Sequence, residues 1–188
     1  MQLDGLKVAV LVTDGYEPSE LTEPVAALRD AGADVTIVSD HAGTIRGKTD
    51  ADTATVDLTL DATSPDEYGA LLLPGGTKNP DTMRQNERGV AFVRHFADAG
   101  KPIAAICHAP WMLVEADIVR GRRVTSYPSL RTDLRNAGAE WVDAEVVVDQ
   151  GLVTSRTPKD LPAFNARMLD EFAEGTHERR ATEAGTVR

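Results

Sequence analysis

The chain has a single cysteine, Cys107, and its place in the sequence is typical of a nucleophile. It follows a short apolar run at residues 102–106, which predicts a buried central strand, and it precedes a predicted helix at 108–115. A cysteine on such a strand-to-helix turn presents its sulfur above the edge of the sheet. The helix N-terminus is expected to stabilise the thiolate and so to lower the pKa of the thiol. The alternative is a buried cysteine that serves only as a small apolar side chain.

His108 is adjacent to the cysteine and is the candidate general base. Neighbouring side chains on a turn diverge, so the sequence leaves open whether His108 bonds the thiol or is a capping or surface histidine. A histidine also needs an orienting carboxylate to act as a base. His41, His95 and His177 fall in a predicted loop, a predicted helix and the predicted tail, and none of these positions indicates a function.

Glycines end another apolar run, at residues 70–73, in the turn Pro74-Gly75-Gly76. Glycines at this position allow backbone N–H groups to approach a substrate oxygen. Together with the amide that follows Cys107, they could form an oxyanion hole. Glycine pairs are common in turns, and it is the position after a buried strand that favours this interpretation.

Two carboxylates, Glu17 and Glu20, follow the first predicted strand at residues 7–13. Carboxylates near the start of a helix often interact only with its positive N-terminus. The functional alternative is that one of them points at the thiol. Burial next to another negative charge would then favour the protonated carboxyl group, which can donate a hydrogen bond to a thiolate. Spacing alone does not decide between the two.

Strand and helix patterns alternate along the chain, which predicts an α/β fold with a mostly parallel sheet. The predicted strands are 7–13, 34–39, 54–60, 70–73, 102–106, 121–126, 145–148 and 152–155, and the predicted helices are 19–29, 87–99, 108–115, 129–136 and 160–174. The last two strands flank Asp149-Gln150-Gly151, a hairpin signal. Without repeats or a linker, residues 1–174 are expected to form one domain, followed by a flexible tail at 175–188.

Composition excludes several classes of protein. The 188 residues include 30 acidic and 20 basic side chains, for a net charge of −10. One cysteine excludes a disulfide framework and a multi-cysteine metal site, and the acidic balance argues against a nucleic-acid partner. The absence of an apolar span or a secretory signal predicts a cytoplasmic protein. Most of the acidic excess is interpreted as solvated surface, either salt-adapted or a product of genome composition.

Four separated motifs together resemble the PfpI/ThiJ superfamily, in particular its intracellular PfpI-type protease and stress-protein branch. They are DGYEPSE at 14–20, LLLPGG at 71–76, AICHAPW at 105–111 and VVVDQGLVTSRTPKDLPAFN at 146–165. Their order is that of the superfamily, and the resemblance covers residues 5–173. It implies a flavodoxin-like α/β sandwich of three layers, related to class I glutamine amidotransferases, with a nucleophile elbow.

The resemblance also implies roles for individual residues. Cys107 corresponds to the nucleophile, His108 to the adjacent histidine and Glu20 to the carboxyl group beside the thiol. The implied oxyanion and substrate-binding positions are Gly75, Gly76, Ala109, Glu17 and Trp111, with the amide after Cys107 contributing to the oxyanion hole.

At three positions the correspondence with the superfamily is incomplete or leaves two interpretations open. Ala109 stands where this branch often has glycine. Trp111 is expected either to narrow the mouth of the pocket or to be a core tryptophan. Asp81 matches a glutamate that, in PfpI-type oligomers, reaches from a neighbouring subunit to complete a Cys-His-Glu triad, and aspartate is one methylene shorter.

The implied chemistry is attack of a thiolate on an electrophilic carbon. We expect a stress-response enzyme that acts on small aldehydes such as methylglyoxal or on their protein adducts, as a deglycase or glyoxalase does. The alternatives are an intracellular cysteine peptidase with an intersubunit Cys-His-Asp triad, and a non-enzymatic redox sensor or chaperone. No metal or cofactor is implied, the partners are a small carbonyl substrate or a peptide, and a homodimer or larger homo-oligomer is expected.

Overall fold

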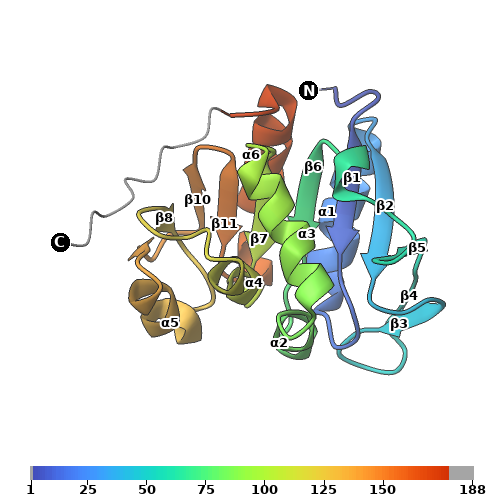
Figure 1. Ribbon diagram of the computed structural model, residues 1–188, viewed down its shortest axis with the longest axis horizontal. Coiled ribbons are helices and arrows are strands. Elements are labelled where there is room, and N and C mark those ends of the chain that lie inside the picture. Colours follow the sequence, from blue (N-terminus) through green and yellow to red (C-terminus); the bar gives the residue numbers. More distant parts are fainter. Residues whose placement is uncertain (1, 178–188) are drawn as a thin grey trace.

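Seven strands form the central sheet of the computed structural model, which describes residues 2–177 (Figure 1). Their order across the sheet is β10-β11-β7-β6-β1-β2-β5, and every neighbouring pair is parallel except β10 and β11. The strands are β1 Lys7–Leu11, β2 Asp34–Ser39, β5 Leu58–Thr59, β6 Ala70–Leu73, β7 Ile103–Ile106, β10 Val146–Asp149 and β11 Leu152–Ser155. The order β2-β1-β6-β7-β11 is flavodoxin-like and confirms the predicted fold class.

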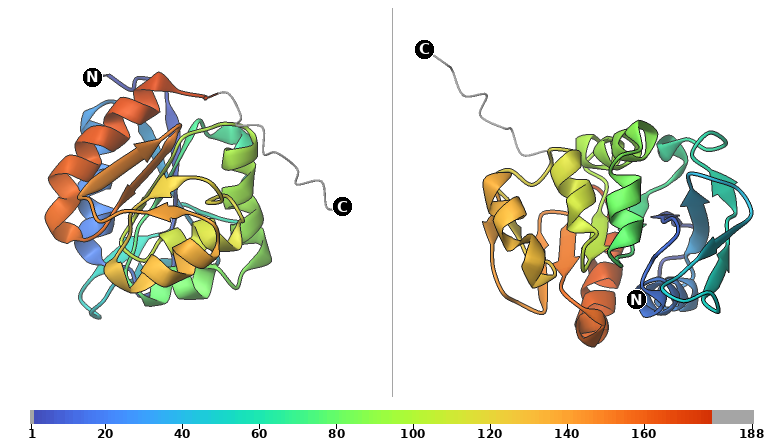
Figure 2. Two further views of the ribbon diagram at one scale, coloured as in Figure 1. Left: turned by 90° about the vertical axis from the view of Figure 1, so that its left-hand side faces the viewer. Right: turned by 90° about the horizontal axis from the view of Figure 1, so that it is seen from below.

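Helices cover both faces of this sheet, as Figures 1 and 2 show. The helices are α1 Pro18–Asp30, α2 Lys78–Met83, α3 Glu87–Asp98, α4 Pro110–Glu115, α5 Arg131–Asn136 and α6 Leu161–Glu174. The buried side chains of α1 and α6 share one apolar core with one face of the sheet. Those of α3, α4 and α5 share a second core with the other face. Since both faces are covered, β6, β7 and β11 are buried along their whole length.

The Thr- and Asp-rich region between β2 and β6 departs from the prediction of one strand at 54–60. It contains β4 (Thr53–Thr55), which pairs with β3 (Thr44–Arg46) in a separate antiparallel hairpin, and then β5 at the edge of the main sheet. The Asp57 side chain lies between β4 and β5 and accepts a hydrogen bond of 2.7 Å from the Ile37 amide. The Ile37 amide therefore donates to a side chain, whereas beside a continuous strand it would donate to a backbone carbonyl.

Two other short elements differ from expectation. The strand predicted at 121–126 is only β8 (Arg123–Val124), which pairs in parallel with β9 (Glu140–Trp141) outside the main sheet. Helix α2 was not predicted, because its six residues have too little periodicity. It is held by Asn79, whose side chain donates to the Pro74 and Gly75 carbonyls and accepts from the Thr13 amide.

The described residues after α6 lie against the domain, which differs from the prediction of a tail from residue 175. The backbone N–H of His177 donates to the Gly100 carbonyl at 2.8 Å, so this residue is docked against the loop between α3 and β7. The rest of the predicted tail, 178–188, lies outside the described residues. Within residues 2–177, no helix is both long and apolar enough to cross a membrane.

Replacing Leu72 with alanine is expected to lower the free energy of unfolding by about 2–5 kcal/mol, because Leu72 is fully buried in the central strand β6. The matched control is Leu58→Ala, since Leu58 is 37% exposed on the edge strand β5, and its cost should be about 1 kcal/mol or less. Urea unfolding followed by circular dichroism measures both. Equal losses would contradict the central position of β6.

Candidate active site

Cys107 lies directly after β7, on a turn whose backbone is strained. Its φ of 66° is in the left-handed region, which side chains other than glycine rarely adopt. Two backbone hydrogen bonds hold the turn: the Cys107 amide donates to the Ser155 carbonyl, and the Tyr127 amide donates to the Cys107 carbonyl. The side chain is 7% exposed. This conformation aims the sulfur away from the strand and over the carboxyl edge of the sheet.

Glu20 lies in the first turn of α1, and its carboxyl group is completely buried beside the thiol. The Gly76 amide donates to its Oε2 at 3.2 Å, while Oε1 has no hydrogen-bond partner among the described residues. A side chain at Gly75 could not be accommodated, because its Cβ would collide with Glu20 Oε2 and lie 2.6 Å from Cys107 Cβ. The glycine turn thus allows the carboxyl group and the thiol to approach each other.

Burial sets the protonation of this carboxyl group. Burial first, and then the nearby charge of Glu17, raise the pKa of Glu20 to about 7 against the opposing hydrogen bonds from Cys107, Gly76 and Gly75. Near neutral pH the group therefore exists both as an acid and as a base. That is the range in which a carboxyl group transfers protons most effectively.

The predicted lowering of the Cys107 pKa is wrong for this environment. Burial, and then the negative charge of Glu20, raise the pKa of the thiol, while the amides of Gly76 and His108 act in the opposite direction. The thiol and the Glu20 carboxyl group titrate as a coupled pair. Protonation of Glu20 therefore removes the negative charge that raises the pKa of the thiol. The reactive combination is accordingly a thiolate beside a protonated Glu20.

His108 contacts the thiol, which settles the question that the sequence left open. Its Nδ1 lies 3.2 Å from Cys107 Sγ, and its Nε2 lies 3.3 Å from Ser129 Oγ. The ring stacks on Tyr127, with centroids 4.5 Å apart. Burial lowers the pKa of His108, so the neutral ring is favoured. Within this chain, the described partner of Nε2 is a hydroxyl group rather than a carboxylate.

A pocket of about 790 Å³ opens above the sulfur. Glu17 lies in its wall and pairs with Lys48, whose Nζ is 3.4 Å from Glu17 Oε2. The residues that line it come mainly from the loops after β1, β3 and β6 and from the turn after β7: Asp14, Gly15, Tyr16, Glu17, Glu20, Arg46, Gly47, Lys48, Asp50, Gly76, Thr77, Lys78, Cys107, His108, Tyr127 and Pro158. Loops that follow parallel strands gather at one edge of a sheet, where ligands bind in such folds.

Three of the predicted oxyanion and substrate-binding residues do not line this pocket: Gly75, Ala109 and Trp111. The Ala109 amide donates to the Ile106 carbonyl within the turn, so the amide next to the sulfur is that of His108. Trp111 does not line the pocket. Its ring centroid is 5.3 Å from that of His108, and its Nε1 donates to Asp133 at 2.9 Å.

Asp81 does not contact His108 within the chain. It lies on α2 and lines a different groove, of about 510 Å³, together with Arg84 and Glu115. Its expected role requires a second subunit and stays a prediction.

Sequence reasoning missed Tyr127 and Ser129, which hold the ring of His108. They are far from Cys107 in the sequence and sit in a loop and a 3-10 turn, which have no periodicity. It also missed the basic residues of the pocket, Arg46, Lys48 and Lys78. No local pattern distinguishes these residues from solvated surface charges.

Comparisons with known proteins place the chain in one family. Residues 6–171 match the profile of the DJ-1/PfpI family. The chain is 49% identical over 165 residues to "Protein/nucleic acid deglycase 2" of Escherichia coli, which covers 87% of this chain and 95% of that protein. It is 46% identical over 167 residues to "General stress protein 18" of Bacillus subtilis, with 88% and 96% covered. The crystal structure of Drosophila melanogaster DJ-1beta superposes with a TM-score of 0.83, at 29% identity, over 92% of this chain and 91% of that one.

Replacing Glu20 with glutamine should change how the reactivity of Cys107 depends on pH. In the unchanged protein, Glu20 ionises near pH 7 and its charge then opposes the thiolate. The rate of alkylation by iodoacetamide should therefore show an inflection near pH 7. In Glu20→Gln the inflection should disappear, and the rate at pH 8 should rise. Cys107 is the only cysteine, so the reagent reports on this site alone.

The matched control is Glu17→Gln, which removes a charge from the same pocket. Glu17 only raises the pKa of Glu20, so this variant should keep the inflection and move it to lower pH. An unchanged profile in Glu20→Gln would show that this carboxyl group does not control the thiol.

Proposed function

Because the chain belongs to the DJ-1/PfpI family, we propose that it is a cysteine-dependent enzyme of the deglycase type. Its substrates would be methylglyoxal and the early adducts that methylglyoxal forms with amines, and it would act in the response to carbonyl stress. The name of the Escherichia coli relative supports the reaction class, and that of the Bacillus subtilis relative supports the stress response.

The observation that carries this proposal is the arrangement of three groups around one sulfur. The thiol has a buried carboxyl group of pKa about 7 on one side, Glu20, and the ring of His108 at 3.2 Å on the other. The amides of Gly76 and His108 lower the pKa of the thiol from nearby. An acid–base group that is active at neutral pH thus stands beside the nucleophile, with backbone donors for a developing oxyanion.

The first step is attack of the Cys107 thiolate on the hydroxylated carbon that joins the amine to the methylglyoxal unit. A carbon–sulfur bond forms and the carbon–nitrogen bond breaks, and the amine leaves with a proton from Glu20. The product is the free amine and a hemithioacetal on the enzyme. With methylglyoxal itself, the thiolate adds to the aldehyde and the same hemithioacetal forms.

The second step moves a proton between two carbons. Glu20, now ionised, takes the proton from the carbon bonded to sulfur, and the adjacent ketone carbon receives a proton in its place. The hydroxyl group on the first carbon gives up its proton and becomes the thioester carbonyl, while the ketone oxygen gains a proton and becomes the hydroxyl group of lactate. This isomerisation converts the hemithioacetal into the thioester of lactate, with no oxidant or reductant consumed. Water then hydrolyses the thioester, releasing lactate and the thiol. The backbone amides stabilise the oxyanion of this last step.

Lactate release from methylglyoxal and from methylglyoxal-treated Nα-acetyllysine, whose side-chain amine forms the adduct, tests this function. The unchanged protein should form lactate, and Cys107→Ala should lose at least about 10³-fold of the rate, since the covalent route is then absent. Glu20→Gln should also lower kcat strongly. The control is His95→Gln, which alters a histidine paired with Asp66 at 3.0 Å and should leave the rate unchanged. Equal lactate formation by Cys107→Ala would refute the proposal.

Two other outcomes would favour the alternatives. Cleavage of peptides without lactate formation, lost in Asp81→Ala, would indicate a peptidase completed by a neighbouring subunit. Oxidation of Cys107 to a sulfinate by mild peroxide, without turnover of any carbonyl compound, would indicate a redox sensor. Mass spectrometry of the intact chain distinguishes this second outcome.

The basic residues of the pocket suggest a preference for anionic substrates. Arg46 and Lys48 pair with Asp50 and Glu17, whereas Lys78 has no ion-pair partner within the described part of the chain. We expect Lys78→Ala to raise KM for adducts that carry a carboxylate or phosphate by about fivefold, corresponding to about 1 kcal/mol for one exposed charge pair.

The same variant should leave KM for neutral methylglyoxal almost unchanged. The matched control is Arg84→Ala, because Arg84 lines the other groove. Steady-state kinetics with the charged and the neutral substrate provide the comparison. An equal rise of KM for both substrates would contradict a role in charge recognition.

A further inference from the structure

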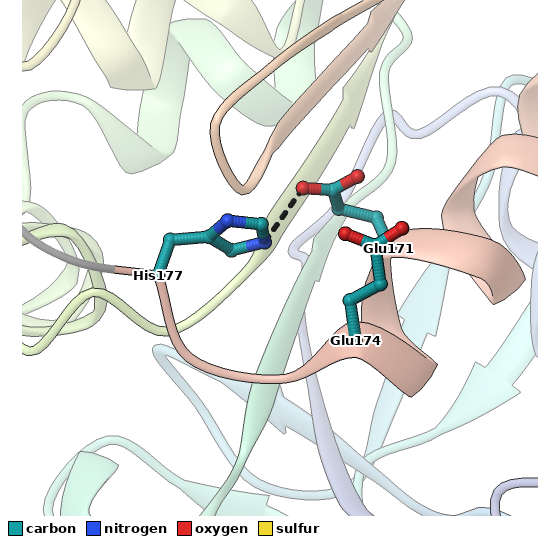
Figure 3. Close-up of side chains that lie close together, drawn as sticks. All are labelled: Glu171, Glu174 and His177. Carbon is teal, nitrogen blue, oxygen red and sulfur yellow. Dashed lines mark ion pairs between the residues drawn. The ribbon is translucent and has the colours of Figure 1, made fainter.

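A second cluster of ionisable side chains lies where α6 ends, at the amino edge of the sheet (Figure 3). It consists of Glu171, Glu174 and His177, each of which offers one ligand atom within 4.8 Å of the others. Cys107 follows the carboxyl end of β7, whereas this cluster adjoins Gly100, which precedes that strand. The two sites are therefore on opposite edges of the sheet.

Glu171 is held in place by the backbone. Its side chain is 6% exposed, and its Oε1 accepts a hydrogen bond of 2.7 Å from the Gly151 amide in the turn between β10 and β11. Within residues 2–177, His177 is its only ion-pair partner, and Glu174 has none. The carboxylates of Glu171 and Glu174 thus lie close to each other and to a single imidazole, that of His177. Among the described residues, only the imidazole of His177 pairs with these two carboxylates, and a bound cation would balance their remaining negative charge.

His177 is held from two sides. Its backbone N–H donates to the Gly100 carbonyl at 2.8 Å, and its ring packs closely over Gly151. The ring Nε2 is buried and lies 2.8 Å from Glu171 Oε1, but it makes no hydrogen bond of acceptable geometry with the described residues. The nitrogen is close to the carboxylate without being directed at it.

A zinc ion held by four ligands in a tetrahedron, with bonds of about 2.0–2.1 Å, places neighbouring ligand atoms about 3.3 Å apart. His177 Nε2 and Glu171 Oε1, now 2.8 Å apart, would move apart by about 0.5 Å to bind the ion. An imidazole with two carboxylates is a donor set that suits zinc and its neighbours among the divalent transition metals. The Gly151 amide orients Glu171 as outer-shell donors orient metal ligands in proteins.

We propose that Glu171, Glu174 and His177 form a binding site for a divalent transition-metal ion of the zinc type. The bound ion would join the end of α6 to the loops that contain Gly100 and Gly151. It would fix the segment after α6 on the domain and would take no part in the chemistry at Cys107. The proposal does not rest on the proposed function, because the two sites share no residue.

The test uses the full chain without an affinity tag, in a Cys107→Ser background, since the thiol could bind metal itself. Isothermal titration with Zn²⁺ should show one site of micromolar affinity, and saturating Zn²⁺ should raise Tm by about 3–6 °C. Glu174→Gln should weaken binding at least about tenfold, and His177→Gln should abolish both effects. His95→Gln, which alters a half-buried histidine paired with Asp66, should respond to Zn²⁺ as the parent does.

The competing explanation is a plain ion pair between His177 and Glu171. In that case Zn²⁺ would bind no more tightly than millimolar and would not change Tm, which would overturn the proposal. An equal response to Zn²⁺ in the parent and in His177→Gln would also overturn it, because the metal would then be bound elsewhere. Since His177 is near the end of the described chain and Glu174 is exposed, both variants should keep the fold, and circular dichroism checks this.

Discussion

The burial of one carboxyl group against one thiol is the constraint on which the rest of this structure depends. The pKa of Glu20 is raised from 4.5 to about 7, so its ionised form costs about 3 kcal/mol above neutral pH. Because the folded state binds this proton more tightly than the unfolded state does, the stability of the fold decreases as pH rises from 4.5 through about 7. The folded state bears this cost, and the result is a carboxyl group that titrates near neutral pH beside a thiol that is itself difficult to ionise.

The surrounding fold supplies the rigidity that this pair requires. Parallel strands bring the turns after β1, β6 and β7 to one edge, and both helical layers bury the strands that carry them. Gly75 lets the carboxyl group and the thiol approach, and Asn79 ties the same glycine turn to Thr13 at the end of β1. The left-handed backbone of Cys107 is maintained by hydrogen bonds to two neighbouring segments. The strain at the nucleophile is thus offset by the packing of the whole sheet.

The carboxyl edge and the amino edge of the sheet hold different groups of side chains. The carboxyl edge holds the thiol, its acid–base partner and a pocket with charged walls, as open α/β sheets generally do. At the amino edge, the end of α6 returns to the loops before β7 and β11 through His177 and Glu171. The first arrangement is the one we propose to carry the chemistry, and the second holds the end of the last helix against the domain.

The sequence by itself determined the sheet and the chemical residues, and only the tertiary structure decided how those residues act. Long apolar runs identified β1, β6 and β7, and the motifs around Cys107, Gly75-Gly76 and Glu20 placed these groups at the ends of strands, because such patterns are local. The short elements β3, β9 and α2 escaped prediction, because they are too short for periodicity to reveal them. Burial also decided that the pKa of the thiol is raised rather than lowered, and local sequence does not report burial. Local sequence also does not report the contacts of Tyr127 and Ser129 with His108, or the contact of His177 with Glu171. Each of these contacts joins segments that only folding brings together.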